Sequence, residues 1–509
     1  MKKSIINGNL YPARGRTRLI VPLAAILCMA AALFAGCSSK AADRGYDIYL
    51  FNAKGENAAQ VEAMAKAYQD LTGVRVKTFS IGAGADQTAP MNTEMNSKNM
   101  PTIFSIQGIN NLAMWFEGGY VQDFSTVKGN PGFTKLASDI APDLRLTLGE
   151  TTNYGIPYNV EGYGYIVDTK MLAELFNVAD PAGIIGDIKG ATYAEWEALV
   201  NAVDEWIKRP AAAAVTINGK SHRLAAAKTG LTGKLNGVIV LMGSQRWTYG
   251  DHLVNVALNA AFATINDSLN AQEADIRKIR GPLVAYAKAL DFKTRHLAGK
   301  NGPARRGQDL ISDANFGYDQ AVQIFAEGKA LFFKQGNWAY NNIAVVNKDM
   351  AERLYFLPVK MPFKASDISA RGMTVEKMER SIPVFVPNYY AVNALCAEDE
   401  KQKAYDFLVW MNTDPAAQRF IIEDMAFIPY NADPAVTTVP NSLGNSILEY
   451  MKEGNTIGDR WHGAPGPWAG DGLGAFLMEQ YLVKPDWTEA DYEIIADYGV
   501  AKWIELLNQ

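Results

Sequence analysis

The feature that most constrains the fold is an alternation of strand-like and helix-like segments that begins after residue 46. Residues 47–51, 74–79 and 102–106 are short apolar or alternating runs, which are typical of β-strands. Between the first two, apolar residues recur at spacings of three and four, which predicts a helix that Asn57 can cap and Gly73 ends. This repetition predicts an α/β fold with a largely parallel sheet, in which ligands bind beyond the carboxyl ends of the strands.

The length of 509 residues exceeds what one hydrophobic core usually holds, so two domains are expected. The same periodicities continue along the rest of the chain. They predict helices over 192–207, 251–263, 282–297, 316–327, 401–412 and from Thr488 onward, and strands over 238–242, 330–333, 354–357 and within 383–395.

The N-terminus has the pattern of a secretory signal peptide. Five basic side chains precede the apolar run Leu19–Gly36, and Cys37 follows directly in a segment that looks like a bacterial lipobox. We expect residues 1–36 to be removed, lipid to be attached to the Cys37 sulfur, and residues 37–44 to tether the chain to the membrane of the cell envelope, outside the cytoplasm. A plain secreted protein and an uncleaved anchor are the alternatives, because the run is near the lower length limit for a membrane span.

Net charge and cysteine content exclude several classes of function. The formal net charge is −5, and residues 1–36 hold five Lys and Arg and no acid, so the remainder carries −10. This argues against a nucleic-acid partner, which is bound through Lys and Arg. Of the three cysteines, Cys28 leaves with the signal peptide and Cys37 takes lipid, which leaves Cys396 in an apolar, strand-like run where a buried thiol is expected.

Motifs that identify enzymes are missing. The sequence has no GxSxG, HExxH, GxxxxGK[ST] or GxGxxG, and its four histidines are scattered. We therefore expect no enzyme, no cofactor and no metal. The pair Tyr389-Tyr390 is of the kind that ferric-ion binders use, but a strand with one Tyr on each face is the favoured interpretation.

Two tryptophans stand where a predicted strand gives way to a turn, among Asn and Gln side chains. They are Trp338 in LFFKQGNWAYNNI and Trp247 in LMGSQRWTYGDH, whereas Trp196 and Trp206 share the apolar face of one predicted helix and are expected in a core. Aromatic faces beside amide groups suit a sugar, whose C–H face packs on a ring and whose hydroxyls need donors and acceptors.

Four segments, in this order and behind the lipobox, carry a resemblance to a known family. They are Met100–Ser125, a strand and a helix ending in Gly; Ile156–Leu172, a crossover segment; Ala321–Ile343, a helix, Gly-Lys turn, strand and Gly-x-Trp turn; and Lys403–Ile421, a helix of the form A-x-x-F-L. The chain resembles the bacterial extracellular solute-binding proteins of family 1, the carbohydrate receptors of ABC importers related to the maltose-binding protein. It departs from the family at Thr102, where Asp is usual.

The resemblance implies a two-lobed periplasmic-binding-protein-like fold of type II, with discontinuous domains joined by hinge crossings. The crossings are expected near Val160, Pro358 and Phe427. Residues 45–160 and 358–427 would then form the first lobe, and residues 161–357 and 428–509 the second, with the ligand between them.

The resemblance also implies ligand-binding residues in the matched motifs, with Trp338 stacking on the sugar. Tyr158 and Asn159 are added from the crossover segment, and Trp461 and Trp468 from a glycine-rich loop over 458–474. The full expected set is Asn52, Lys54, Gln107, Asn110, Asn111, Tyr158, Asn159, Glu161, Trp247, Trp338, Trp461 and Trp468.

The expected function is capture of a sugar or oligosaccharide and its delivery to ABC permease subunits by a monomeric lipoprotein. Three alternatives stay open at this point. One is the same fold binding a peptide, polyamine or metal complex, for which an acidic group such as Glu161 would suit a polyamine. The others are a surface glycosidase with two carboxylates across a cleft, and a purely structural lipoprotein.

Overall fold

The computed structural model describes residues 44–509, except 83–84, 142–143, 149–150 and the side chain of Asn110. The predicted signal peptide and Cys37 lie outside the described residues. Within the described part of the chain, no helix has the length and apolar character needed to cross a membrane.

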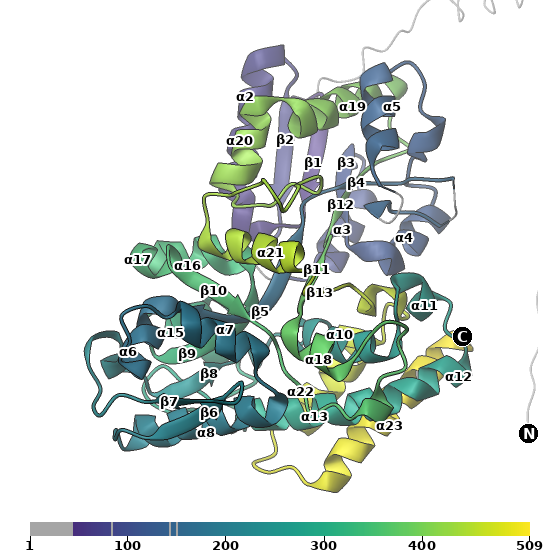
Figure 1. The fold of residues 1–509 in the computed structure, drawn as a ribbon. Coiled ribbons are helices and arrows are strands. Elements are labelled where there is room, and N and C mark those ends of the chain that lie inside the picture. Colours follow the sequence, from purple (N-terminus) through teal and green to yellow (C-terminus); the bar gives the residue numbers. More distant parts are fainter. Residues whose placement is uncertain (1–43, 83–84, 142–143, 149–150) are drawn as a thin grey trace, which may run out of the picture. The chain divides into compact units, whose positions relative to one another are not determined.

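The first lobe, the upper one in Figure 1, is built on a five-stranded sheet of order β2-β1-β3-β12-β4. Its strands are β1 (Ile48–Asn52), β2 (Val76–Ser80), β3 (Ile103–Ile106), β4 (Ile156–Pro157) and β12 (Tyr389–Val392). Strands β1, β2 and β3 are parallel, and β12 runs antiparallel to β3 and β4. The helices of this lobe are α2 (Ala58–Thr72), α3 (Thr88–Met95), α4 (Gly108–Glu117), α5 (Pro131–Asp139), α19 (Glu398–Thr413) and α20 (Pro415–Arg419).

The second lobe holds a six-stranded sheet of order β13-β11-β5-β9-β8, with β10 also paired to β5. Its strands are β5 (Glu161–Asp168), β8 (Gly237–Val240), β9 (Ala330–Gly336), β10 (Leu354–Leu357), β11 (Ile382–Phe385) and β13 (Thr456–Ile457), and a separate hairpin joins β6 (Ala214–Ile217) to β7 (Lys220–Arg223). Strands β8 and β9 are parallel, so the turns that follow them lie at the same edge of the sheet.

Helices surround the second sheet and form most of the lower part of Figure 1. They are α6 (Thr169–Phe176), α7 (Ala182–Gly190), α8 (Tyr193–Lys208), α9 (Trp247–Gly250), α10 (His252–Ala261), α11 (Ile265–Leu269), α12 (Glu273–Ile276), α13 (Arg280–Thr294), α14 (Asp313–Phe316), α15 (Tyr318–Ala326), α16 (Tyr340–Val346), α17 (Lys348–Ala351), α18 (Val375–Arg380), α21 (Ser442–Glu453), α22 (Ala475–Gln480) and α23 (Glu489–Leu507). Short helical turns that bear on the site are η6 (Asn337–Ala339), η9 (Trp461–Gly463) and the π-helical η10 (Ala469–Gly474).

The chain passes between the lobes three times. It crosses first between β4 and β5, and later between α20 and α21, where Val160 and Ile428 form a bridge at which the two crossings meet. The remaining crossing lies between Phe385 and Tyr389, not near Pro358 as expected, because β11 pairs with β5 and β13 of the second sheet. Pro358 does end β10, but a strand terminator does not reveal which sheet the next strand joins.

The predicted run over 383–395 is therefore two strands in two sheets. Tyr389 and Tyr390 lie on β12 and pack into different core clusters, which confirms one Tyr on each face. The run does not extend to Cys396, which lies half-buried in the turn after β12 rather than in a strand.

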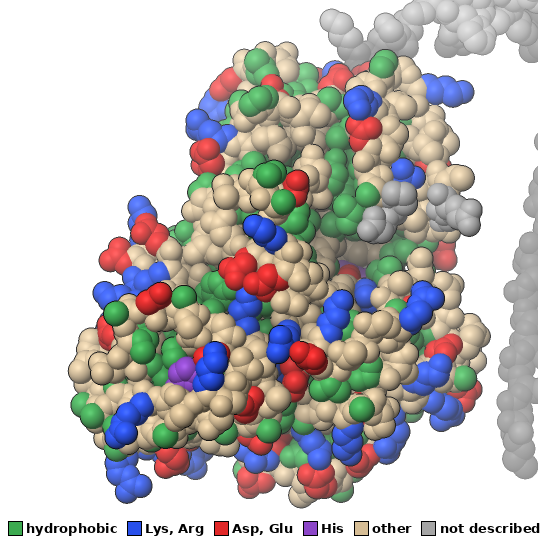
Figure 2. Space-filling model, viewed as in Figure 1, with side chains coloured by type: hydrophobic (Ala, Val, Ile, Leu, Met, Phe, Trp, Pro, Cys, Tyr) green, Lys and Arg blue, Asp and Glu red, His purple; other side chains and the backbone are tan. Residues whose placement is uncertain are grey.

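Charges on the face seen in Figure 2 are of both signs and interspersed. This pattern fits the negative net charge of the chain and does not resemble the basic stripe of a nucleic-acid binder.

Candidate functional site

A cavity of about 400 Å³ lies between the lobes, next to the crossings, and both lobes line it. Its volume falls in the lower part of the range usual for small-molecule sites, about 300–1,000 Å³. The two walls differ in chemistry.

The second lobe contributes an aromatic wall, which consists of Trp247, His252, Trp338, Phe385 and Trp461. His252 is central: its ring centroid lies 5.0 Å from Trp247, 5.1 Å from Trp338 and 6.4 Å from Trp461. Behind the wall, Tyr163 of β5 stacks on His252 at 4.6 Å with an interplanar angle of 14°. Five rings from α9, α10, η6, β11 and η9 thus form one apolar surface on the cavity.

Trp338 owes its position to the glycine two residues before it. The ring lies directly over Gly336 at the end of β9, where a Cβ atom would come within 2.1 Å of the indole. Trp338 is only 7% exposed. It packs against Tyr163 and Trp247 as well as lining the cavity, so it belongs to both the core and the wall.

The first lobe contributes a polar wall. It comes from the turns after β1, before α3 and at the start of α4, all at one edge of the sheet. Its side chains include two acids, a lysine, two glutamines, a threonine and an asparagine: Lys54, Glu56, Asp86, Gln87, Thr88, Gln107 and Asn111.

Lys54 joins the two walls. Its Nζ lies 2.6 Å from a carboxylate oxygen of Glu161, 3.7 Å from Glu56, and 5.6 Å from the centroid of the Trp338 ring. Burial alone would lower the pKa of Lys54, but Glu161 and then Glu56 reverse this, so that the pKa is raised and the lysine is charged. The pKa of Glu56 is raised, chiefly by burial.

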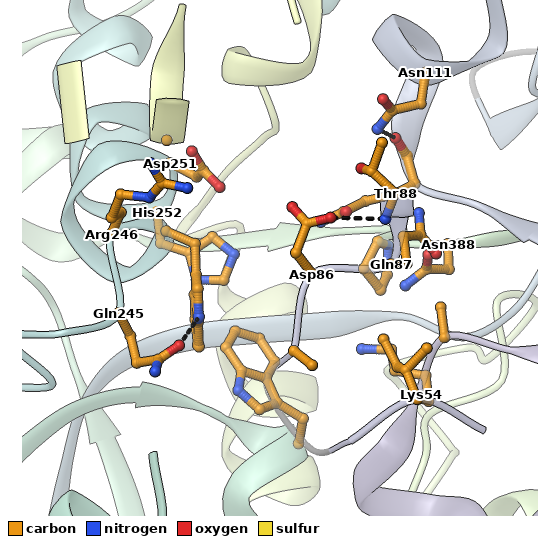
Figure 3. Close-up of a pocket in the computed structure, with 18 of the residues that line it drawn as sticks. Lys54, Asp86, Gln87, Thr88, Asn111, Gln245, Arg246, Asp251, His252 and Asn388 are labelled. Carbon is orange, nitrogen blue, oxygen red and sulfur yellow. Dashed lines mark hydrogen bonds between the residues drawn. The ribbon is translucent and has the colours of Figure 1, made fainter. Parts of the chain in front are cut away.

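Asp251 lies at the N-terminus of α10, yet it does not cap that helix. Burial raises the pKa of Asp251 to about 8, and the nearby Asp471 is the next contribution. Arg246 is paired with Asp471 at 2.9 Å. Figure 3 shows Arg246, Asp251 and His252 on one side of the cavity, and Gln87, Thr88 and Asn388 on the other.

His252 is buried, and its Nδ1 has no hydrogen-bond partner. Burial, followed by the charge of Lys334, keeps the pKa of His252 well below its ordinary value, so the ring is neutral. A neutral imidazole stacked among aromatic rings offers the cavity a flat face without a charge.

The structure brings seven of the expected site residues to the cavity: Lys54, Gln107, Asn111, Glu161, Trp247, Trp338 and Trp461. Three others lie behind it. The Tyr158 hydroxyl donates to Asn52 at 2.8 Å, the Asn52 carboxamide accepts from the Lys54 backbone at 2.9 Å, and Asn159 donates to Glu161 at 3.0 Å. They position Lys54 and Glu161.

Trp468 is not at the cavity. Its Nε1 donates to the Gly499 carbonyl at 2.7 Å and its ring packs on Trp503. The glycines that follow it have a packing role, since a Cβ on Gly250 of α9 would lie 2.8 Å from Gly474 and 3.0 Å from Gly470. The side chain of Asn110 lies outside the described residues.

Sequence reasoning missed several lining residues, among them Glu56, Asp86, Ser244, Gln245, Arg246, Asp251, His252, Tyr318, Asn388 and Asp471. Most stand within a few residues of a predicted site, in the turn before Trp247 or at the start of the helix behind it. A search of whole turns, instead of single motif positions, could have found them.

Comparisons with known proteins agree with this geometry. Residues 63–439 match the family model of the bacterial extracellular solute-binding proteins. No curated protein matches the sequence.

Solved structures with a similar fold include a chitin oligosaccharide binding protein (15% identity, TM-score 0.59, covering 91% of this chain and 99% of that one) and the solute-binding protein RafE in complex with raffinose (13%, 0.58, 90% and 99%). The GacH receptor of Streptomyces glaucescens, solved unliganded and with acarbose, is similar at 15% identity and a TM-score of 0.56, covering 91% of this chain and 98% of that one.

Proposed function

Because this chain belongs to the bacterial extracellular solute-binding proteins, we propose that it captures a sugar or short oligosaccharide between its lobes. The observation that carries the proposal is the division of the cavity into an aromatic wall and a polar wall. A sugar ring laid against Trp247 and Trp338 would turn its hydroxyls toward Gln107, Asn111 and Glu161. The similar folds of a chitin oligosaccharide binding protein and of RafE in complex with raffinose support the same class of ligand.

Capture requires no chemical step from the protein, which we propose is not an enzyme. Each hydroxyl left without a partner would cost about 1–3 kcal/mol, so the polar wall sets specificity. Since the ligand touches both lobes, it binds the closed arrangement more tightly than an open one, and this difference in affinity drives closure.

The cellular setting is part of the proposal. Signal-peptide removal before Cys37 and lipid on its sulfur would hold a monomeric receptor at the membrane, close to ABC permease subunits that accept the ligand. The N-terminal sequence and the extracellular family support this.

The test is thermal unfolding of the chain lacking residues 1–36 against a panel of mono- and oligosaccharides, followed by tryptophan fluorescence. A ligand at 100 times its dissociation constant stabilises the folded state by about 2.7 kcal/mol. We expect a raised midpoint with one group of sugars. No shift across a broad panel, with shifts from peptides or metal complexes instead, would overturn the proposal.

A further inference from the structure

The charged groups that line the cavity are mostly acidic. Its two cations already form ion pairs: Lys54 pairs with Glu161 and Glu56, and Arg246 pairs with Asp471. Asp86 of the first lobe and Asp251 of the second also line the cavity, and neither forms an ion pair with a Lys or Arg of the described residues. Two carboxyl groups on opposite lobes therefore face one cavity, and neither of them is paired with a Lys or Arg of the described residues.

The Asp251 carboxyl is only partly satisfied, by a backbone hydrogen bond from Gly470. Its Oδ1 is buried and has no hydrogen-bond partner among the described residues. The carboxyl lies against Gly470, where a Cβ would come within 3.0 Å of Oδ1. The first turn of α10 donates nothing to it, although Asp251 occupies the N-cap position. Asp86 uses Oδ1 to accept from the Thr88 backbone at 2.7 Å, which leaves its other oxygen available.

Two further buried polar atoms of cavity-lining residues have no hydrogen-bond partner among the described residues. The Oδ1 of Asn388, a residue 6% exposed, has no partner, and neither has the Nδ1 of His252, which is 8% exposed. Since buried polar atoms are normally hydrogen-bonded, the unpaired oxygens of Asp251 and Asn388 around one cavity indicate a ligand that brings N–H or O–H donors. An ammonium group brings three donors and a positive charge at a single point.

We infer that the ligand is an amino sugar, whose protonated amine lies between Asp86 and Asp251 while its ring packs on the aromatic wall. This rests on the proposed function and narrows it to sugars with a free amine. The amine would contact both lobes at once, so that it favours closure as well as binding. N-acetylation, which removes both the charge and two donors, would abolish this contact.

A pH dependence follows from the groups that face Asp251, which are Asp86, Asp471, Lys334, Arg246 and the neutral His252. With its pKa raised to about 8, Asp251 is protonated in the empty cavity at neutral pH. Binding an ammonium requires the ionised form, so the proton must leave. Affinity for the amine therefore rises from pH 5 to pH 7, by up to about tenfold per unit, while affinity for a neutral sugar does not.

The experiment is titration calorimetry of the chain lacking residues 1–36 with glucosamine oligosaccharides and with N-acetylglucosamine oligosaccharides and glucose oligosaccharides of the same length. We expect the free amine to bind at least tenfold more tightly than the other two. Asp251→Asn and the exposed Asp86→Asn should each reduce that ratio several-fold, whereas Asp139→Asn, on α5 and away from the cavity, should leave it unchanged.

The outcomes separate the two proposals. Equal or tighter binding of the neutral sugars would overturn the amine inference and leave sugar capture standing. If spermidine bound as tightly as the amino sugars, the ligand would not have to be a sugar, and both proposals would be overturned on that point. No binding of any sugar would refute the proposed function and this inference together.

Discussion

At the scale of single residues, the rings of the aromatic wall have two roles, stacking on the ligand and supporting the core, which can be separated experimentally. Trp247 is only half-buried, whereas Trp338 is 7% exposed and packed on Tyr163. Loss of either ring removes a stacking surface, but only Trp338 supports the core behind it.

We therefore expect Trp247→Ala and Trp338→Ala each to weaken sugar binding tenfold or more. Trp338→Ala should also lower the free energy of unfolding by about 3–5 kcal/mol, and Trp247→Ala by much less. Denaturant unfolding and calorimetry on the same samples measure both quantities. Trp503→Phe, at a buried ring away from the cavity, is the control that should lose stability and keep affinity. Unchanged affinity in Trp247→Ala would contradict the stacking role.

Lys293 shows how burial makes stability depend on pH. It is 1% exposed, its Nζ has no hydrogen-bond partner, and burial lowers its pKa to about 7. Between pH 7 and about 10.5 the unfolded chain holds a proton at this lysine that the folded chain has lost, so stability rises with pH across that window.

Lys293→Met removes the free-energy cost of burying a lysine side chain. We expect it to raise the free energy of unfolding by roughly 1–3 kcal/mol at pH 6–7, with the gain shrinking as the pH approaches 10. Urea unfolding at several pH values measures it. A gain that is the same at pH 6 and pH 10 would show that packing, and not the buried charge, is responsible.

The sequence could predict some site residues and not others. Trp338, Trp247 and Lys54 stand in turns that follow regular strands, and such turns are visible in the sequence. Asp251 and Asn388 are distant in the chain and line one cavity only once the two lobes have been assembled, which no local pattern specifies.

At the scale of elements, the turn from β9 into η6 depends on a glycine. Gly336→Ala would place a methyl group within 2.1 Å of the Trp338 ring, which also packs against Tyr163 and His252.

We expect Gly336→Ala to displace the indole, shift the tryptophan fluorescence and weaken sugar binding at least tenfold. Gly183→Ala is the matched control, because a Cβ at Gly183 on helix α7 meets nothing within 4 Å. That control should leave affinity unchanged and keep or slightly raise stability. Wild-type affinity in Gly336→Ala would show that the turn can readjust.

Most elements were predictable from periodicity, and caps fixed several of their ends. Thr192 and Glu195 form the capping box of α8, and Gly73 ends α2 with a φ of 76°. The assignment of strands to sheets was the part that failed, since β11 and β12 lie three residues apart and belong to different lobes. Pairing partners far away in the chain decide this, and a strand carries no mark of its partner.

At the scale of the whole molecule, one place where the two lobes come very close lies between α4 and η9. Gly108, at the start of α4, has a φ of 66°, and a Cβ there would come within 2.3 Å of the His462 ring on η9 of the other lobe. Closure at this edge of the cavity requires a residue without a side chain.

Gly108→Ala should therefore hold the lobes apart. We expect weaker sugar binding and a larger radius of gyration of the liganded protein in small-angle X-ray scattering. Gly119→Ala, on the same lobe, has a similar φ of 71° but nothing within 4 Å, so it reproduces the backbone strain alone. Partial recovery in Gly108→Ala combined with His462→Ala would identify the ring as the obstacle, and no recovery would assign the defect to the backbone.

The place of β12 has a consequence for how the protein is made. This strand fills the sheet of the first lobe between β3 and β4, yet it comes from residues 389–392. The first lobe cannot close its sheet until most of the chain has been synthesised, because such long-range pairing forms late. The N-terminal half of the chain therefore stays incompletely folded until residues 389–392 are available to pair with β3 and β4.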